Sequence, residues 1–335
     1  MKRLHLILIG LLLIPSLFLT SCDQGDTPET TITPAFTTMK DYMIANDLDI
    51  NKVINNGINF VVGAPADTDL DAFLNKYYII DIRSAADFST KGHIAGAKNV
   101  AFANILTEGA AAQAAGKPAL VVCYTGQTAC YATALMRMYG YSNTQALKWG
   151  MSGWNESTAY AWNNAIGNEA NGHANWSYGA APSNMVFDDP EISSLSTIGE
   201  TILKSRVELA VQEGFKTVKG TDVLNSPNNY FINNYFSSAH YTGFGHINGA
   251  YRINPLTLAD NSYRGLDPTQ KVVTYCYTGQ TSAVVTACLR VLGYDAYSLT
   301  FGMNGMFNAN PFWSDPAITN QWGADSKPKS LPLVQ

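Results

Sequence analysis

The sequence feature that most constrains the fold is a long internal repeat. Residues 92–97 (GHIAGA) recur as residues 245–250 (GHINGA), and residues 123–128 (CYTGQT) recur unchanged as residues 276–281. Both motifs return after 153 positions, so the two matches are in register. Because this period is far longer than one unit of a solenoid, it indicates two copies of a whole domain.

Each copy alternates buried-strand patterns with helical patterns. Residues 77–82 and 119–123 are short, largely apolar runs typical of strands that are covered on both faces. Residues 128–139 and 281–292 follow the repeated cysteine motifs, and each predicts a helix that ends before a glycine. The expected fold class is therefore α/β, with a mainly parallel sheet in each copy and helices on both faces.

Repeat and composition together divide the chain into six segments. They are a signal peptide (1–21), a flexible tether (22–38), a first domain (39–156), an interdomain linker (157–197), a second domain (198–313) and a C-terminal tail (314–335). The tether is rich in Thr, Pro and Asp, and the linker is rich in Asn, Ala, Gly and Ser. The tail is expected to pack over the surface or to stay partly loose.

The first 22 residues predict an export signal. Lys2 and Arg3 precede an apolar run at 6–14, which is too short to span a membrane and is followed by a polar tract. Residues 19–22 (LTSC) are similar to the bacterial lipobox, whose cysteine receives lipid and becomes the mature N-terminus. We therefore expect an extracytoplasmic, periplasm-facing lipoprotein anchored to a membrane through Cys22. Ordinary secretion with an incidental Cys22 is the alternative.

Composition excludes several classes of protein. Apolar residues make up 46% of the chain and charged residues 14%, which is enough to build a core and excludes a disordered chain. The net charge of −5 comes without a basic run, so no nucleic-acid partner is expected. Five cysteines are too few and too irregular for a disulfide framework, and no Cys or His spacing indicates zinc. Neither a metal nor a cofactor is expected.

The repeated cysteine motif carries the expected chemistry. Cys123 and Cys276 each stand at the end of a predicted strand, before a turn and a helix, where backbone N–H groups and the helix N-terminus favour a thiolate. We therefore expect depressed pKa values and nucleophilic, catalytic sulfurs. Gly126 and Gly279 let the loop curl around the sulfur, and the threonines at the loop ends are expected to cap the helix or donate a hydroxyl. The predicted substrate-binding loops comprise Tyr124, Thr125, Gly126, Gln127 and Thr128 in one copy and Tyr277, Thr278, Gly279, Gln280 and Thr281 in the other.

Taken together, these motifs resemble the rhodanese (thiosulfate sulfurtransferase) superfamily. The matching parts are Asp81-Ile82-Arg83, the 92–97 motif with Asn99, the cysteine loop, and the Gly-Met pairs at 150–151 and 302–303. The resemblance covers roughly residues 39–156 and 198–308. It implies two rhodanese-like domains in which a cysteine takes a sulfane sulfur as a persulfide and passes it to a thiophilic acceptor. The implied partners are small sulfur donors and acceptors, with a protein of the cell envelope as a further candidate.

Other uses of the same loop remain open. A phosphatase-type Cys-x5-Arg loop needs a terminal arginine to clamp an oxyanion, and that position holds Ala129 in one copy and Ser282 in the other. Phosphate transfer is therefore not favoured. Because the loop has no cation, we expect a donor less anionic than thiosulfate, such as a polysulfide or a small persulfide. The alternatives are handling of selenite-type chalcogen species and a non-catalytic sulfur-carrier or interaction module in an envelope complex.

Supporting residues differ between the copies. Asp81, Arg83 and Asp87 correspond to Asn234, Phe236 and His240, so the second copy lacks the charged residues at the strand end. We expect Arg83 to form a structural ion pair with an acidic neighbour; direct contact with the substrate is the alternative.

Two histidines and two further cysteines have alternative interpretations. His93 and His246 are expected to fix a turn by bonding to the backbone rather than to form a Cys–His dyad. Cys130 is either a resolving thiol or, in our preferred interpretation, a packed core thiol. Cys288 is expected in the core.

Overall fold

Two parallel sheets, one in each copy of the repeat, form the framework of the computed structural model, which describes residues 34–335. The first sheet has the order β1 (Val61–Val62), β5 (Gln145–Leu147), β4 (Ala119–Val122), β2 (Tyr78–Asp81), β3 (Lys98–Asn99). The second has the order β7 (Thr217–Val218), β11 (Ala296–Leu299), β10 (Val272–Tyr275), β8 (Phe231–Asn234). Every pairing in these two sheets is parallel, so the expected α/β class is confirmed. A short antiparallel pair joins β6 (Trp176–Ser177) to β9 (His246–Ile247).

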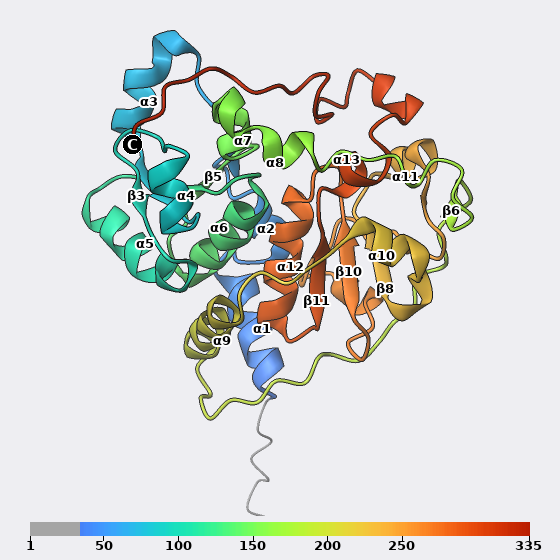
Figure 1. Cartoon of the computed structure of the whole chain (residues 1–335). Helices are drawn as coiled ribbons and strands as arrows, with labels where there is room; N and C mark the ends of the chain where they lie inside the picture. Colours follow the sequence, from blue (N-terminus) through green and yellow to red (C-terminus); the bar gives the residue numbers. More distant parts are fainter. Residues whose placement is uncertain (1–33) are drawn as a thin grey trace, which may run out of the picture. The chain divides into compact units, whose positions relative to one another are not determined.

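Helices connect the strands and cover the sheets (Figure 1). The α-helices are α1 (Ala35–Ala45), α2 (Ile50–Ile54), α3 (Leu70–Lys76), α4 (Ala85–Thr90), α5 (Ile105–Ala114), α6 (Gln127–Tyr139), α7 (Met151–Trp154), α8 (Tyr160–Asn163), α9 (Gly199–Glu213), α10 (Gly220–Asn225), α11 (Ser238–Phe244), α12 (Gln280–Leu292) and α13 (Gly302–Phe307). Short 3-10 turns lie at η1 (Asp67–Asp69), η2 (Phe102–Asn104), η3 (Glu156–Thr158), η4 (Pro227–Asn229), η5 (Ser262–Gly265) and η6 (Pro311–Ser314). Among residues 34–335, no helix combines the length and the apolar character needed to cross a membrane.

The strands that lead to the cysteines are central and fully buried. All four residues of β4 and all four of β10 are buried, which explains their apolar sequences ALVV and VVTY. Cys123 and Cys276 directly follow these strands, at the carboxyl edge of each sheet. Ligands of open α/β folds generally bind at that edge.

The two helices that follow the cysteine loops pack side by side at the junction of the copies (Figure 1). α6 and α12 confirm the predicted helices: each starts one residue earlier than expected, and they end at Tyr139 and Leu292, directly before Gly140 and Gly293. A single hydrophobic cluster includes Leu135 of α6, Leu289 of α12 and Met39 of α1. The interface between the copies is therefore a continuous core.

Two predicted segments need correction. Residues 35–38, expected to be part of the tether, form the start of α1, and Phe36 is buried there beside the ring of Tyr263. The linker at 157–197 is more than a connector, since it contains α8 and β6. The signal peptide, Cys22 and the rest of the tether lie outside the described residues, and the other boundaries stay predictions.

The C-terminal segment 329–334, here called the C-terminal strap, packs on the first copy. Val334 and His93 exchange backbone hydrogen bonds of 2.9 Å, and Leu331 N–H donates to Trp154 O at 3.1 Å. Leu331 is fully buried in a cluster with Ile94 and Trp154. In Figure 1 the C-terminus ends beside α3, close to the first sheet. The strap is thus an ordered part of the first copy, so for these residues the structure confirms the first of the two expected alternatives, a tail packed over the surface, and not a partly loose one.

Candidate active site: two cysteine loops

The Cys123 loop wraps backbone N–H groups around a sulfur. Gly126 has φ 82° and is the N-cap residue of α6, a left-handed conformation that glycine adopts without strain. Its N–H donates to Cys123 Sγ at 3.1 Å, and the N–H of Ala129 donates at 3.3 Å. The inward-facing amides expected from the sequence are therefore present in this copy.

The Cys276 loop has the same backbone shape but different partners. Gly279 has φ 76° and precedes α12. The N–H of Ser282 donates to Cys276 Sγ at 3.4 Å, and the Cys276 thiol lies 3.7 Å from the hydroxyl oxygen of Ser282. This sulfur therefore has a hydroxyl neighbour that Cys123 lacks.

Both sulfurs are buried: Cys123 is 6% exposed and Cys276 is 2% exposed. Burial raises the pKa of the Cys123 thiol; the N–H groups of Ala129, Thr125 and Gly126 act in the opposite direction but do not outweigh it. The depressed pKa expected for Cys123 is thus wrong, because desolvation exceeds the effect of the amides.

The Gly-Met pairs bind the backbone carbonyl groups of the two loop cysteines. In the first copy, Met151 N–H donates to Cys123 O at 2.8 Å, and in the second copy Met303 N–H donates to Cys276 O at 2.9 Å. Gly150 and Gly302 lie so close to these carbonyls that a Cβ would come within 2.2 Å and 2.1 Å of the two oxygens. The motif matched in the sequence therefore fixes which way the loop peptides face.

Two glutamines cross between the loops. Gln127 Oε1 accepts a hydrogen bond from Phe301 N–H at 2.8 Å, and Gln280 Nε2 donates to Thr125 O at 3.1 Å. The sequence predicts that each glutamine binds substrate in its own loop. Each side chain also contacts the other copy, so the two loops are linked directly, and the role of the glutamines in substrate binding stays a prediction.

An aromatic cluster fills the space beside these glutamines. It consists of Trp149 from the first copy, Trp162 from the linker, Phe301 from the second copy and Trp322 from the tail. The ring centroids of Trp162 lie 4.9 Å from those of Trp149 and Phe301, and Trp162 Nε1 donates to Thr125 O at 3.1 Å. The linker and the tail therefore help to close the site.

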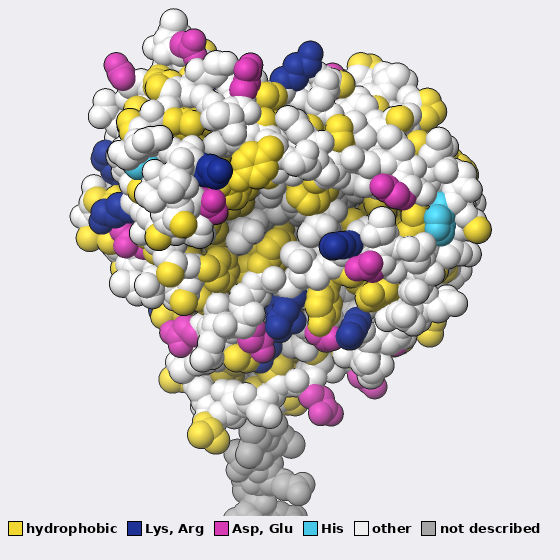
Figure 2. Space-filling model, in the orientation of Figure 1, with side chains coloured by type: hydrophobic (Ala, Val, Ile, Leu, Met, Phe, Trp, Pro, Cys, Tyr) yellow, Lys and Arg dark blue, Asp and Glu magenta, His cyan; other side chains and the backbone are white. Residues whose placement is uncertain are grey.

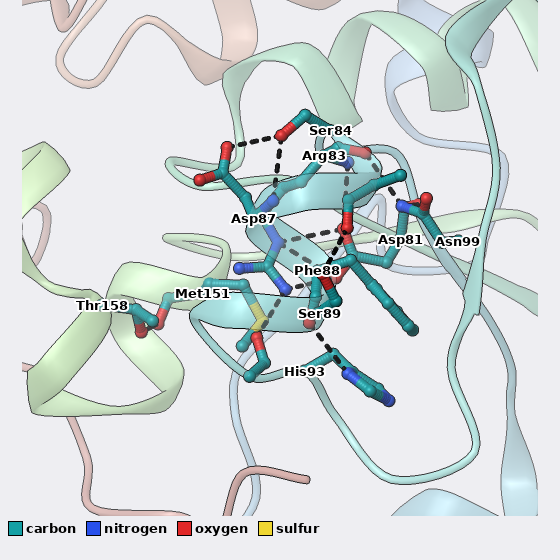
Figure 3. A network of polar contacts seen from close by, with 12 residues as sticks. Asp81, Arg83, Ser84, Asp87, Phe88, Ser89, His93, Asn99, Met151 and Thr158 are labelled. Atoms are coloured by element: carbon teal, nitrogen blue, oxygen red, sulfur yellow. Dashed lines mark hydrogen bonds and ion pairs between the residues drawn. The ribbon is translucent and has the colours of Figure 1, made fainter. Parts of the chain in front are cut away.

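The predicted ion pair of Arg83 is confirmed (Figure 3). Arg83 Nη2 donates to Asp81 Oδ2 at 2.7 Å and to Gly92 O at 2.8 Å, and both ionic side chains are 1% exposed. Arg83 Nη1 has no hydrogen-bond partner among the described residues, and the guanidinium carbon lies 5.0 Å from the ring centre of Tyr124. Arg83 thus supports the first residue of the loop from behind.

In the second copy an aromatic stack replaces this pair. Asn234 Oδ1 accepts from Phe236 N–H at 2.9 Å, just as Asp81 Oδ1 accepts from Arg83 N–H at 3.0 Å. Phe236 then stacks on Tyr277 with a centroid distance of 4.4 Å. The backbone turn is the same in both copies although the charge is lost.

Tyr277 has a polar partner that the sequence did not reveal. Its hydroxyl is hydrogen-bonded to His240 Nδ1, and His240 Nε2 lies 3.7 Å from Asp315 Oδ2. Asp315 belongs to the tail, and no local pattern connects it with the loop.

His93 and His246 fix the turns, as expected. Their Nδ1 atoms bond to Phe88 O at 3.1 Å and to Tyr241 O at 3.3 Å, and each ring stacks on the residue whose carbonyl it contacts. Burial lowers the pKa of His246, which favours the neutral form. Within residues 34–335 neither histidine has a hydrogen bond to a cysteine, so the dyad is not formed.

The end-of-loop threonines do not cap the helices. The N-cap residues are Gly126 and Gly279, and no side chain of Thr128 or Thr281 caps its helix. A hydroxyl earlier in the second loop takes a backbone partner instead: Thr278 Oγ1 accepts from Gln280 N–H at 3.2 Å.

Cys130 and Cys288 are core thiols, as preferred from the sequence. They are 1% and 0% exposed, and burial raises the pKa of both. Cys130 also borders a cavity of about 190 Å³ beside the Cys276 loop. Lys148 of the first copy lines the same cavity, and burial lowers the pKa of this lysine.

The described part of the chain contains no group of three or more His, Cys, Asp or Glu side chains arranged to hold a metal ion. On the face shown in Figure 2, charged side chains of both signs are scattered rather than gathered in one patch.

Comparison with known proteins identifies the family. Residues 66–157 and 234–309, together half of the chain, match the rhodanese-like domain. Both cysteine loops lie within these matches. The chain therefore belongs to the rhodanese-like domain family and contains two such domains.

Solved structures that match this chain are distant from it in sequence. A thiosulfate sulfurtransferase from Pseudomonas aeruginosa is 13% identical, with 90% of this chain and 49% of that chain covered and a TM-score of 0.27. A 3-mercaptopyruvate sulfurtransferase from Leishmania major is 13% identical, covering 77% and 76%, with a TM-score of 0.26. A rhodanese-related protein from Thermoplasma volcanium is 19% identical, covering 27% and 87%, with a TM-score of 0.24. No curated protein matches the sequence.

Proposed function

We propose that this protein is a sulfurtransferase that carries a sulfane sulfur on a cysteine persulfide from a donor to a thiophilic acceptor. The observation that carries the proposal is the geometry of the loops. At the end of a central strand and beside a helix N-terminus, the Cys123 sulfur accepts two backbone N–H groups and the Cys276 sulfur accepts one. Membership of the rhodanese-like family supports the same chemistry.

The reaction consists of two displacements. A cysteine thiolate attacks the outer sulfur of the donor, so that a new S–S bond forms while the donor bond breaks and its electron pair leaves with the departing group. An acceptor thiolate, cyanide or sulfite then attacks the outer sulfur of the persulfide, and the cysteine leaves as a thiolate. The loop N–H groups face the sulfur on which negative charge appears, and they need no reorganisation to stabilise it.

The donor that suits these loops carries little negative charge. All five residues that follow each cysteine are neutral, and the cation that lines the cavity beside the Cys276 loop is Lys148 from the other copy. A polysulfide or a small persulfide fits this arrangement better than dianionic thiosulfate. A far higher kcat/KM for thiosulfate than for polysulfide would contradict this choice of donor.

The first experiment looks for the persulfide directly. After incubation with polysulfide, mass spectrometry of the full chain should find an added mass of about 32 Da on Cys123, Cys276 or both, the mass of the sulfur atom that persulfidation adds. Turnover should fall in Cys123→Ser or Cys276→Ser and disappear in the double variant. Cys288→Leu, which introduces the residue of the first copy at a core position, is the matched control and should retain turnover.

A non-catalytic sulfur carrier is the second candidate, and the burial of both sulfurs favours it. In that case the added mass would appear on the cysteines, but the double Cys→Ser variant would not change the rate at which acceptor is consumed. Full turnover in the double variant would therefore exclude the enzymatic proposal.

We also propose that the protein is anchored in the envelope by a lipid on Cys22, facing the periplasm. The lipobox-like residues 19–22 are the support for this proposal. Cys22→Ser should move the protein from the membrane fraction to the soluble fraction, whereas Cys130→Ala should remain with the membranes. Unchanged membrane association of Cys22→Ser would contradict the proposal.

A further inference from the structure

The two cysteine loops are identical over six residues and differ at the next one. Position 129 is alanine in the first copy, whereas position 282 is serine in the second. Ser282 Oγ lies 3.7 Å from Cys276 Sγ and 2.8 Å from the hydroxyl oxygen of Ser298. The sulfur of Cys276 is therefore the first member of a chain of three hydrogen-bonding groups.

The first copy lacks this chain entirely. Ser298 is on β11 opposite Thr274 of β10, and the corresponding register position in the first sheet is Ala146, opposite Val121 of β4. Ala129 and Ala146 thus place methyl groups where the second copy has two hydroxyls. The repeat itself provides a comparison of the same loop with and without the hydroxyl chain.

The hydroxyl chain can serve both states of the sulfur. Ser282 and Ser298 are fully buried, and a hydroxyl both donates and accepts. When Cys276 is a thiol, the Ser282 hydroxyl oxygen accepts a hydrogen bond from the S–H group, and the Ser282 O–H donates to Ser298. Facing a thiolate, both hydroxyls rotate, so that Ser298 donates to Ser282 and Ser282 donates to the sulfur. Of the residues that line the cavity beside the Cys276 loop, Lys148 of the first copy carries a positive charge, whereas Tyr277 and Cys130 do not.

We propose that Ser282, supported by Ser298, is a positioning residue that makes Cys276 the principal sulfur acceptor of the two cysteines. The inference rests on the proposed function and refines it. A hydrogen bond to a charged atom contributes more than one to a neutral atom. Ser282 therefore acts when Cys276 attacks the donor as a thiolate, and again when Cys276 Sγ receives the electron pair as the persulfide is broken.

The test measures thiolate reactivity without any sulfur donor. The full chain is treated with iodoacetamide at neutral pH, and fragment spectra of the peptides report the rate at each cysteine. Cys276 should react faster than Cys123. Ser282→Ala should slow Cys276 about tenfold, as expected for loss of a hydrogen bond to a charged group, and should leave the rate at Cys123 unchanged. Ser282→Thr, which keeps a hydroxyl, should restore most of the rate.

Matched variants in the first copy provide the reciprocal test. Ala129→Ser together with Ala146→Ser should raise the rate at Cys123, and Ser298→Ala should slow Cys276 less than Ser282→Ala does. Thermal unfolding of each variant shows whether the fold is intact. An unchanged Cys276 rate in Ser282→Ala, or an equal loss in Ser282→Thr, would overturn the inference.

Failure of the proposed function is distinguishable from failure of this inference. If no donor places a persulfide on either cysteine while the alkylation rates respond to Ser282 as expected, the sulfurtransferase proposal fails and the role of Ser282 in thiolate reactivity stands. If persulfides form, but their distribution between Cys276 and Cys123 is the same in wild type and in Ser282→Ala, the inference is wrong and the proposed function stands.

Discussion

Replacement of Gly150 by alanine is expected to remove most of the stability of the first copy. Gly150 has φ 58° and ψ −150°, a conformation that side-chain-bearing residues rarely adopt. A Cβ there would lie 2.2 Å from Cys123 O and 2.6 Å from Tyr124 C. Both are backbone atoms of the cysteine loop, so the loop must move. We expect a loss of about 4 kcal/mol or more in the free energy of unfolding, measured by urea denaturation.

Gly116→Ala is the control that separates backbone strain from the clash. Gly116 also has a positive φ, 67°, but a Cβ added there would meet no atom within 4 Å. Its replacement should cost about 1 kcal/mol, since only the left-handed conformation is penalised. Gly302→Ala, where the Cβ would lie 2.1 Å from Cys276 O, should match Gly150→Ala. If Gly150→Ala were no worse than Gly116→Ala, the close approach would not be what requires glycine.

Arg83→Phe alone is expected to destabilise the protein by about 3–5 kcal/mol, because it leaves the buried Asp81 carboxylate without its cation. The two side chains are each 1% exposed, so solvent does not screen the loss. The double variant Asp81→Asn, Arg83→Phe introduces the pair that the second copy already uses, Asn234 and Phe236. It should recover much of the stability, because Asn234 bonds to the backbone of Phe236 as Asp81 bonds to that of Arg83.

A double-mutant cycle gives the size of this coupling. Urea denaturation of the wild type, the two single variants and the double variant should yield a coupling of about 1–3 kcal/mol, as expected for residues in one buried network. Additive single effects would show that the ion pair contributes nothing beyond the separate side chains. Loss of folding in the double variant would contradict the structural equivalence of the two copies.

The fold could be predicted largely from the sequence because its signals are local. The repeat fixes the number of domains, the apolar runs of β2 and β4 indicate buried strands, and the helices after the cysteines begin within one residue of the expected position. The structural roles of Arg83, His93 and His246 could also be predicted from the sequence, because each side chain bonds to a partner within ten residues.

The site could be predicted only in part, because its closure depends on distant segments. Gln280, Trp162 and Trp322 reach the region of the Cys123 loop from the other copy, the linker and the tail. No pattern of neighbouring residues in the sequence predicts these contacts, because they join residues far apart in the chain. Cys123 itself is only 6% exposed, and this burial explains why the expected low pKa of Cys123 is wrong.

The absence of a helix cap from Thr128 has a local cause, whereas donation of its hydroxyl to a bound group stays a prediction. Helix α6 begins directly after the left-handed Gly126, and the N–H of Ala129, in the first turn, points to Cys123 Sγ. The sulfur thus accepts a hydrogen bond from the first turn of the helix, where a capping side chain would otherwise place its oxygen. A capping hydroxyl from Thr128 is therefore not needed for this N–H group.

The C-terminal strap has a consequence for the order in which the protein is made. Domains usually fold from the N-terminal end as the chain leaves the ribosome. Here the first domain lacks Leu331, which packs against Ile94 and Trp154, until translation has passed residue 331. The domain translated first is therefore the one completed last, and its apolar surface stays uncovered throughout translation of the second.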